Sequence, residues 1–218
     1  MEKWGNYVGG FGATNPKLIV VGIAPGADEV IAGRPFVGPS GKILAEDLRD
    51  GGMNIEDTYR TNVFKYKLPD NDFARYKEME LSLDLAMQEL TQEIYALNPN
   101  CILGLGDPVL FALAGKSGKY NNIGTWRGSI LEILGRKAVF TWHPAHELHG
   151  SGEGMFKSWQ RYVRKFDVKR AIEESKFNRY DKPNRFINIA RSSADLYRFL
   201  ERNICLLYTS PSPRDRTR

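Results

Sequence analysis

The chain has 218 residues, a formal net charge of +5 and 42% hydrophobic residues, which is enough for one domain with a substantial core. The mild basic excess is compatible with DNA binding, and no signal peptide or apolar run of about 18 residues predicts secretion or a membrane span. Cys101 and Cys205 form neither a disulfide framework nor a CxxC site, so we expect a protein of a reducing, cytoplasmic compartment.

The first half of the chain alternates strand and helix patterns. The predicted elements are a buried strand over 17–23, a helix over 41–50, a strand over 58–64 and a long helix over 73–97. Gly51 and Gly52 end the first helix, and Asn98-Pro99 ends the second.

The alternation continues with a strand over 101–105 and a helix through Ala114, for which Asp107 is the expected N-cap. Strands over 130–134 and 138–142 then pair around Gly135. This order predicts an α/β fold with three layers, in which helices cover both faces of a central, mainly parallel sheet.

The character of the sequence changes after residue 150. Residues 154–175 predict a basic amphipathic helix docked on the sheet, with Phe156, Trp159, Tyr162 and Val163 on its apolar side. A polar linker over 176–185, a strand over 186–190 and a helix that opens at Ser192 follow. Residues 206–218 have the composition of a disordered tail or of translated adapter or vector sequence, and we exclude them from functional reasoning.

A loop rich in glycine and proline follows the first strand, with Gly22-Ile23-Ala24-Pro25-Gly26 at its start and Gly33 to Gly41 at its end. Glycines let backbone N–H groups approach a ligand, and prolines keep the loop in shape. Phe36 in this frame is either a core residue or a platform for a planar ligand. The loop has neither the phosphate-binding Gly-Lys-Ser/Thr ending nor the dinucleotide spacing.

Three ordered segments carry a resemblance to a known family. The run GIAPGADEVIAGRPFVGPSGKIL, then Thr61-Asn62-Val63-Phe64-Lys65, then His143-Pro144-Ala145 resemble motifs of the uracil-DNA glycosylase superfamily. The likeness covers roughly residues 4 to 150 and implies a glycosylase-like domain over residues 1–175.

The resemblance also implies roles for individual residues. Phe36 would stack on a flipped uracil, Asn62 would read its O4 and N3–H edge, and His143 would stabilise negative charge on O2 as the base leaves. Gly22, Ile23, Ala24, Pro25 and Gly26 would line the base pocket with their backbone.

The chain departs from the family pattern at two places. Ile23 stands where this branch usually has a glutamate, so we expect Asp28, or Glu29 beside it, to supply the acid that handles water. The family's four-cysteine iron–sulfur cluster cannot form with two cysteines, so we expect no cofactor and no metal. A rival interpretation is a zinc site built from His143, His146, Glu147 and His149, although the spacing is not H-E-x-x-H.

DNA contacts are expected around the pocket. By resemblance, Ser40, Gly41 and Lys65 would meet the DNA strand, and Leu148 would fill the gap that a flipped base leaves. Further cations that could reach phosphates are Lys67, Lys116, Lys119 and Arg127.

The last predicted strand and helix, within residues 176–205, resemble the start of the 3′-5′ exonuclease domain of family A DNA polymerases. We therefore expect a monomeric enzyme of a bacterium or phage-infected host that excises uracil from DNA in base-excision repair. The alternative is a catalytically weak or silent DNA-binding module in front of a covalently linked polymerase.

Overall fold

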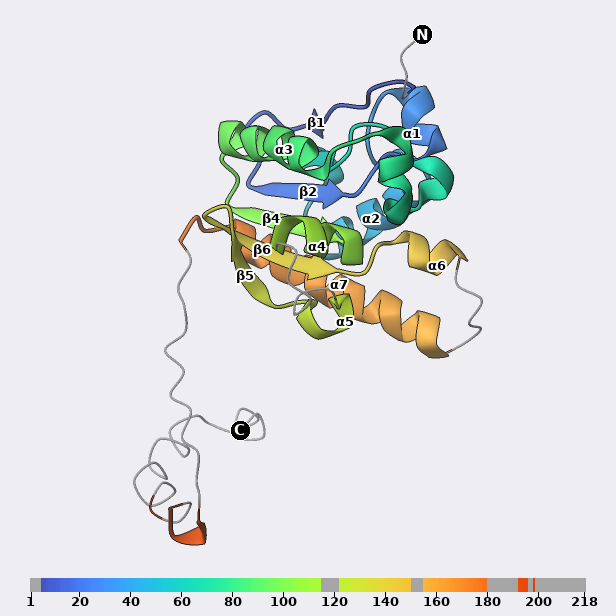
Figure 1. Ribbon diagram of the computed structural model, residues 1–218. Helices are drawn as coiled ribbons and strands as arrows, with labels where there is room; N and C mark the ends of the chain where they lie inside the picture. The colour runs from blue at the N-terminus through green and yellow to red at the C-terminus, as the bar shows by residue number, and fades with distance from the viewer. Residues whose placement is uncertain (1–4, 115–121, 150–154, 180–191, 196–197, 199–218) are drawn as a thin grey trace. The chain divides into compact units, whose positions relative to one another are not determined.

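The computed structural model describes residues 5–114, 122–149, 155–179, 192–195 and 198 (Figure 1). The chain divides into two compact units, Met1–Tyr180 and Asp181–Arg218. In the second unit the Oγ of Ser192 accepts the N–H of Asp195 at 3.2 Å, which confirms the helix start predicted there. The strand expected over 186–190 and the tail lie outside the described residues, and the domain limits at 175 and 205 stay predictions.

A six-stranded sheet forms the centre of the first unit. Its strands are β1 (Phe11–Gly12), β2 (Leu18–Gly22), β3 (Tyr59–Asn62), β4 (Cys101–Leu105), β5 (Ile130–Ile133) and β6 (Arg136–Thr141). In the order β1-β3-β2-β4-β6-β5, the four central strands are parallel and the two edge strands are antiparallel. The mainly parallel sheet is therefore confirmed.

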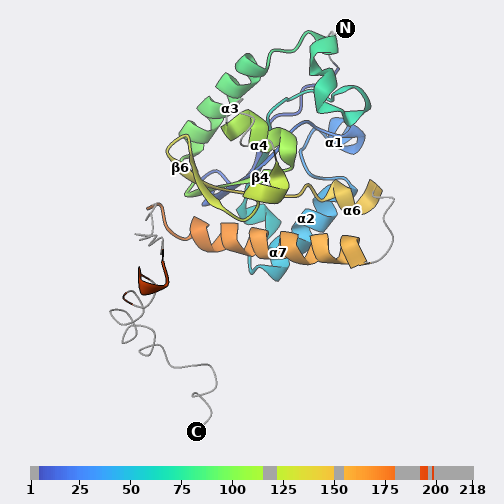
Figure 2. The same cartoon turned by 60° about the horizontal axis from the view of Figure 1, so that its bottom comes forward.

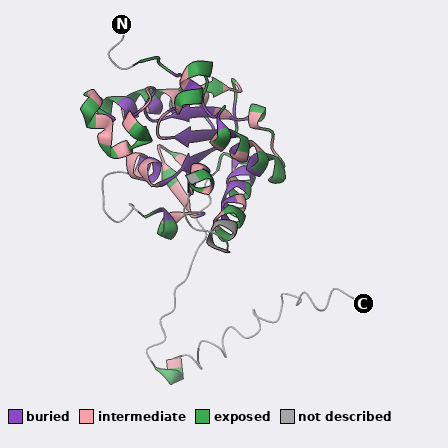
Figure 3. Cartoon of the chain, turned by 90° about the vertical axis from the view of Figure 1, so that its right-hand side faces the viewer, coloured by how far each residue is buried: buried purple, intermediate pink, exposed green. Residues whose placement is uncertain are grey.

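Alternate residues of β2 enter two separate cores, because successive side chains of a strand point to opposite faces. Leu18 and Val20 pack with residues of α2 (Pro39–Asp50) and α7 (Met155–Ser175). Ile19 and Val21 pack with residues of α3 (Leu83–Leu97) and α4 (Asp107–Ala114). Figure 2 shows the two helix layers on opposite faces of the sheet, and Figure 3 shows the buried strands between them.

The loop after β2 contains a helix that the sequence pattern does not predict. Residues Ala27–Ala32 form α1, which begins after Gly26 and ends at Gly33, a residue in the left-handed conformation with φ 65°. The helix has only six residues, too few to show a helical period in the sequence. Similarly, α2 begins at Pro39 rather than at Gly41, since proline is well suited to the first helical position.

The long helix expected over 73–97 is two elements. The short 3₁₀ segments Ile55–Asp57, Pro69–Asn71 and Phe73–Met79 precede α3. The last of them ends at Glu80, whose φ of 56° breaks the helical path. Ser82 then starts α3, and its Oγ accepts the N–H of Leu85 at 3.3 Å.

Asp107 does not cap α4 as expected. Its carboxylate accepts the N–H of Ile123 at 2.7 Å, at the start of α5 (Ile123–Trp126). The first turn of α4 instead begins with the carbonyl of Gly106, which accepts the N–H of Leu110. The aspartate therefore links α4 to α5 instead of capping the start of α4.

The packing face of α7 also differs from the prediction. Trp159 and Tyr162 are 50% and 64% exposed, while Val163 is buried as expected and the side chain of Phe156 lies outside the described residues. The face against the sheet and α2 instead carries Val168, Ala171 and Ile172 together with the charged residues Arg164 and Asp167. None of the helices in the described part of the chain has the length and apolar character needed to cross a membrane.

Candidate active site

A cleft of about 770 Å³ opens at the carboxyl ends of β2 and β3, beside the segment that follows β6. Ligands of open α/β sheets bind at this edge, outside the carboxyl ends of the strands. Its walls include Phe36, Asn62 and His143, so the structure brings together the three side chains to which the sequence gives the base-binding roles.

Gly22, the last residue of β2, lets two of these side chains approach each other. A Cβ atom on Gly22 would lie 2.4 Å from Oδ1 of Asn62 and 2.9 Å from Cζ of Phe36, closer than side-chain atoms approach. Gly22 pairs with Asn62 in the parallel register of β2 and β3. The glycine is therefore required by the packing of the site and does not itself line the cleft.

Phe36 is held in a strained backbone conformation, with φ 58° in the region that favours glycine. Its carbonyl packs against Gly41 of α2, where a Cβ atom would lie 2.0 Å from the Phe36 oxygen. The ring is nearly buried yet forms part of the cleft wall, and its plane lies 28° from that of His143. Phe36 is thus both a core residue and an available aromatic surface.

Asn62 presents its side-chain amide to the cleft. The residue is buried, and its backbone carbonyl accepts a hydrogen bond from Nζ of Lys65 at 3.0 Å. Within the part of the chain that the structure describes, the side-chain amide has no hydrogen-bond partner. A buried amide that faces a cleft without a partner is suited to pair with a ligand.

His143 lies two residues beyond β6, just before α6 (Ala145–His149). Its Nδ1 accepts the backbone N–H of Ala145 at 3.1 Å, so the proton of the neutral ring is assigned to Nε2. Gly106 lies beside the histidine with φ 91°, a backbone conformation that favours glycine, and a Cβ atom there would be in ordinary contact with the Cβ of His143 at 3.4 Å. The arrangement makes His143 a hydrogen-bond donor through Nε2.

The pKa of His143 is lowered to about 4, chiefly because burial disfavours the charged ring and also because His146 and Arg164 are close. The imidazole is therefore neutral at pH 7. A neutral ring with a fixed tautomer can donate one hydrogen bond to a group that gains negative charge.

The first loop contributes backbone and carboxylates to the cleft. Ala24, Pro25 and Gly26 line it, followed by Asp28 and Glu29 of α1. Glu29 is buried, and its Oε1 accepts the N–H of Gly38 at 3.1 Å, so this carboxylate ties the two ends of the loop together. Asp28 is exposed at the cleft and, among the described residues, its carboxylate has no hydrogen-bond partner.

Ile23 has a half-buried side chain that turns towards the protein interior. It packs against the core that contains Ile19 and Val21 and is not part of the cleft wall. Its carbonyl accepts the N–H of Phe64 at 2.8 Å, which joins the ends of β2 and β3.

Two of the four expected DNA contacts lie at the cleft and two do not. Ser40 lines it at the first turn of α2, and Leu148 lies at its edge with 44% of its side chain exposed. Gly41 is buried against Phe36, as described above. Lys65 is 3% exposed, and its Nζ lies 2.7 Å from Oε2 of Glu93, so the expectation of a phosphate contact is replaced by a buried ion pair.

Of the additional cations, the structure describes Arg127 and Lys67. Arg127 pairs with Asp167 at 3.1 Å and lies over the ring of Trp142. Lys67 is half-buried, and Lys116 and Lys119 lie outside the described residues.

Sequence reasoning missed two residues of the cleft wall, Asp70 and Asn71. Both have positive φ, 50° and 56°, within the short 3₁₀ segment that starts at Pro69. The Pro-Asp-Asn-Asp sequence signals a turn, since Asn and Asp tolerate this conformation, but it does not reveal that the turn folds over the cleft.

The described side chains do not support the rival interpretation of a zinc site. Among the described side chains, which include His143, His146 and Glu147 but not His149, no group of three or more could hold a metal ion. Glu147 instead faces Arg164 at 2.7 Å.

A four-cysteine iron–sulfur cluster does not fit this chain. The sequence has two cysteines. Cys101 is buried in β4, where burial raises the pKa of its thiol to about 12. A cluster needs four thiolate ligands, so no step of the chemistry below involves one.

Comparisons with known proteins agree with this geometry. The family model described as the uracil DNA glycosylase superfamily matches residues 9–167. The type-4 uracil-DNA glycosylase of Archaeoglobus fulgidus is 35% identical over 151 residues, which cover 66% of this chain and 73% of that protein. The type-4 enzyme of Thermotoga maritima is 35% identical over 144 residues, 66% of this chain and 72% of its own. A DNA polymerase of Bacillus phage SP01 is 30% identical over 136 residues, 62% of this chain and 14% of the polymerase. The chain therefore belongs to the uracil-DNA glycosylase superfamily.

Proposed function

We propose that this protein excises uracil, the product of cytosine deamination, from DNA in base-excision repair. The observation that carries the proposal is the cleft in which the amide of Asn62, the imidazole of His143 and the ring of Phe36 meet. Relatives named type-4 uracil-DNA glycosylase support the same reaction.

Recognition of the base follows from the chemistry of two side chains. A base must leave the duplex before its glycosidic bond can be reached, and the ring of Phe36 then offers a surface on which it can stack. The amide of Asn62 can donate to O4 and accept from N3–H of uracil. Cytosine presents the opposite polarity at both positions, so the same amide rejects it.

Cleavage breaks the bond between C1′ and N1, and the electron pair moves to the base, where O2 carries part of the charge. Nε2–H of neutral His143 donates to O2 and stabilises this charge. The sugar passes through an oxocarbenium-like state, and water adds to C1′ and loses a proton.

We assign Asp28 as the base that orients the attacking water and accepts its proton. Its carboxylate is exposed at the cleft, whereas Glu29 already accepts the N–H of Gly38. Because Ile23 supplies no acid, the leaving-group hydrogen bond carries more of the catalysis, and we expect slower excision than an enzyme with an acid at this position would give.

Contacts to DNA come from two sides of the cleft. The N–H groups in the first turn of α2, at Ser40, suit a phosphate of the flipped nucleotide. Leu148, exposed at the edge, suits the gap that the base leaves in the duplex.

The alternative is a catalytically silent DNA-binding module in front of a polymerase. Two observations favour it, the apolar side chain at Ile23 and the similarity to part of a phage DNA polymerase. Such a module would bind DNA that contains uracil and leave the glycosidic bond intact.

The test is incubation with an oligonucleotide that contains one uracil, followed by alkali, which cleaves abasic sites. We expect strand cleavage at the uracil with and without a chelator, and none in a matched oligonucleotide with cytosine. Binding without cleavage, at high enzyme concentration and long times, would instead favour the silent module.

A further inference from the structure

The helix that follows His143 is too short to hold its own position. α6 has five residues, and helices of that length are not stable without tertiary contacts. Its first turn is bonded to the histidine corner, because His146 N–H donates to the carbonyl of His143 and Glu147 N–H to that of Pro144, both at 3.0 Å. Whatever fixes α6 therefore also fixes His143.

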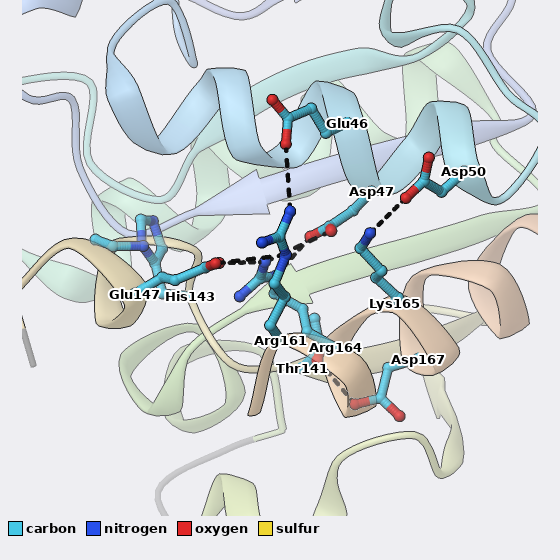
Figure 4. Close-up of polar contacts among 11 residues, drawn as sticks. Glu46, Asp47, Asp50, Thr141, His143, Glu147, Arg161, Arg164, Lys165 and Asp167 are labelled. Atoms are coloured by element: carbon cyan, nitrogen blue, oxygen red, sulfur yellow. Dashed lines mark hydrogen bonds and ion pairs between the residues drawn. The ribbon is translucent and has the colours of Figure 1, made fainter. Parts of the chain in front are cut away.

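Glu147 joins α6 to α7 through two ion pairs, while α6 also packs against α2. Its Oε2 lies 2.7 Å from Nη2 of Arg164, and its Oε1 lies 3.5 Å from Nε of Arg161, one turn earlier on α7 (Figure 4). The side chain of Glu147 is 23% exposed, so it is partly shielded from water at this junction.

Arg164 is itself fixed from a third element. Its Nε donates to Oδ2 of Asp47 on α2 at 2.5 Å, and the two side chains are 2% and 1% exposed. The guanidinium is a planar fork, so it can bind both carboxylates at once and set the angle between them.

This three-way contact joins the two sides of the cleft. α2 begins at Pro39 and Ser40, which line the cleft on the side of Phe36, and Asp47 lies two turns further along the same helix. Glu147 belongs to the opposite side, with His143 and Leu148.

We propose that Arg164 is a positioning residue for excision, which holds α6 through Glu147 and thereby keeps His143 and Leu148 at a fixed place opposite Phe36. The inference rests on the proposed function, since it names a residue for that reaction. Arg164 acts through Glu147 and does not touch the base.

The variant Glu147→Ala tests this role without leaving a buried charge unpaired, because the pair of Arg164 and Asp47 remains. A misplacement of about 1 Å at a reacting group lowers rates up to about 100-fold, so we expect single-turnover excision to fall about 10- to 100-fold with little change in KM. Glu147→Gln, whose amide oxygen still accepts from Arg164, should restore part of the rate.

The matched control is the neighbouring ion pair of Lys165 and Asp50. It also joins α7 to α2, at 2.5 Å, but it lies on the surface and has no contact with α6 among the described residues (Figure 4). Lys165→Met and Asp50→Asn should leave excision unchanged.

A double replacement tests Arg164 directly. Arg164→Met with Asp47→Leu removes the tether while it avoids an unpaired buried charge. We expect a loss similar to that of Glu147→Ala, and no further loss when Glu147→Ala is added, because all three residues act through one contact.

A second measurement does not depend on activity. NMR titration of the His143 imidazole should give a pKa of about 4 in the unaltered protein, and a higher pKa in Glu147→Ala than in Glu147→Gln. Both variants remove the same negative charge beside Arg164, so a difference between them reports how far a loosened α6 lets water reach the ring. If the unaltered protein excises no uracil, the proposed function fails, while this titration still decides the inference. A pKa of His143 that is the same in Glu147→Ala and in Glu147→Gln, or wild-type excision by Glu147→Ala where the protein is active, overturns it.

Discussion

The rings of Phe36 and His143 lie 6.5 Å apart between centroids, with an angle of 28° between their planes. Phe36 belongs to the loop after β2 and His143 to the segment after β6, more than a hundred residues later. The aromatic surface and the hydrogen-bond donor thus meet at one cleft.

Asn62→Ala and His143→Ala should each remove most of the excision activity. Loss of one donor that stabilises developing charge costs about 2.7–4 kcal/mol, or roughly 100- to 1,000-fold in rate. Single-turnover kinetics measure the loss, while circular dichroism and DNA-binding assays should show the fold and affinity largely retained. Near-wild-type cleavage by either variant would exclude that residue from the site.

The pH dependence of excision should follow the low pKa of His143. Protonation of Nδ1 breaks the hydrogen bond from Ala145, so the rate should stay level from neutral pH to about 5 and fall with an apparent pKa of about 4. A break near pH 6.5 in the rate profile would contradict a lowered pKa of His143.

The His143 imidazole also makes the free energy of unfolding depend on pH. Its pKa is lower in the folded than in the unfolded chain, so its contribution is fully present above pH 6.5 and is lost as the pH falls from 6.5 to 4. Denaturant unfolding of the protein and of His143→Ala should therefore differ in pH dependence within that window, and identical curves would count against the assignment.

Ile23→Glu should raise uracil excision well above that of the unaltered protein if the remainder of the site is functional. The residue lies between Gly22 and the cleft residue Ala24, and by resemblance the family pattern has glutamate there. A glutamate that turns out of the core towards the cleft would supply the acid for the attacking water. Ile23→Gln, with the same length and no acid, is the control. If the unaltered protein is fully active and Ile23→Glu has no effect, another residue positions the water. Asp28→Asn would then be the next variant to measure.

Lys65→Met should destabilise the fold and leave the salt dependence of DNA binding unchanged. The substitution leaves Glu93 without its buried partner, which costs about 3–5 kcal/mol, whereas a phosphate contact would add to the slope of log K against log salt. Lys67→Met, at a half-buried lysine nearby, is the control. A reduced salt slope with unchanged stability would restore Lys65 as a DNA contact.

Leu148→Ala should slow excision from duplex DNA more than from a single strand. An apolar side chain in the gap supports base flipping only where a stack must be opened. The ratio of the two single-turnover rates measures the effect, and an equal loss on both substrates would mean that Leu148 packs the cleft instead.

Local sequence signals were sufficient for the long central strands of the sheet but not for β1, which has only two residues. The apolar run at 18–21 and the glycines and prolines after it act over a few residues, so β2 and the loop could be predicted, and the agreement of β4 with residues 101–105 has the same basis. Asn62 and His143 were proposed from their resemblance to the family motifs, and both lie at the carboxyl-end edge of the sheet, where the cleft is.

Only the tertiary structure decided the roles of the charged residues. In the sequence, Lys65, Arg164 and Asp47 are all consistent with solvent-exposed positions, and nothing local distinguishes a phosphate contact from a buried ion pair. Their partners lie 28 and 117 residues away along the chain. Burial lowers the local dielectric and makes each such charge depend on its partner, and burial is fixed only when helices from distant parts of the chain pack on the sheet.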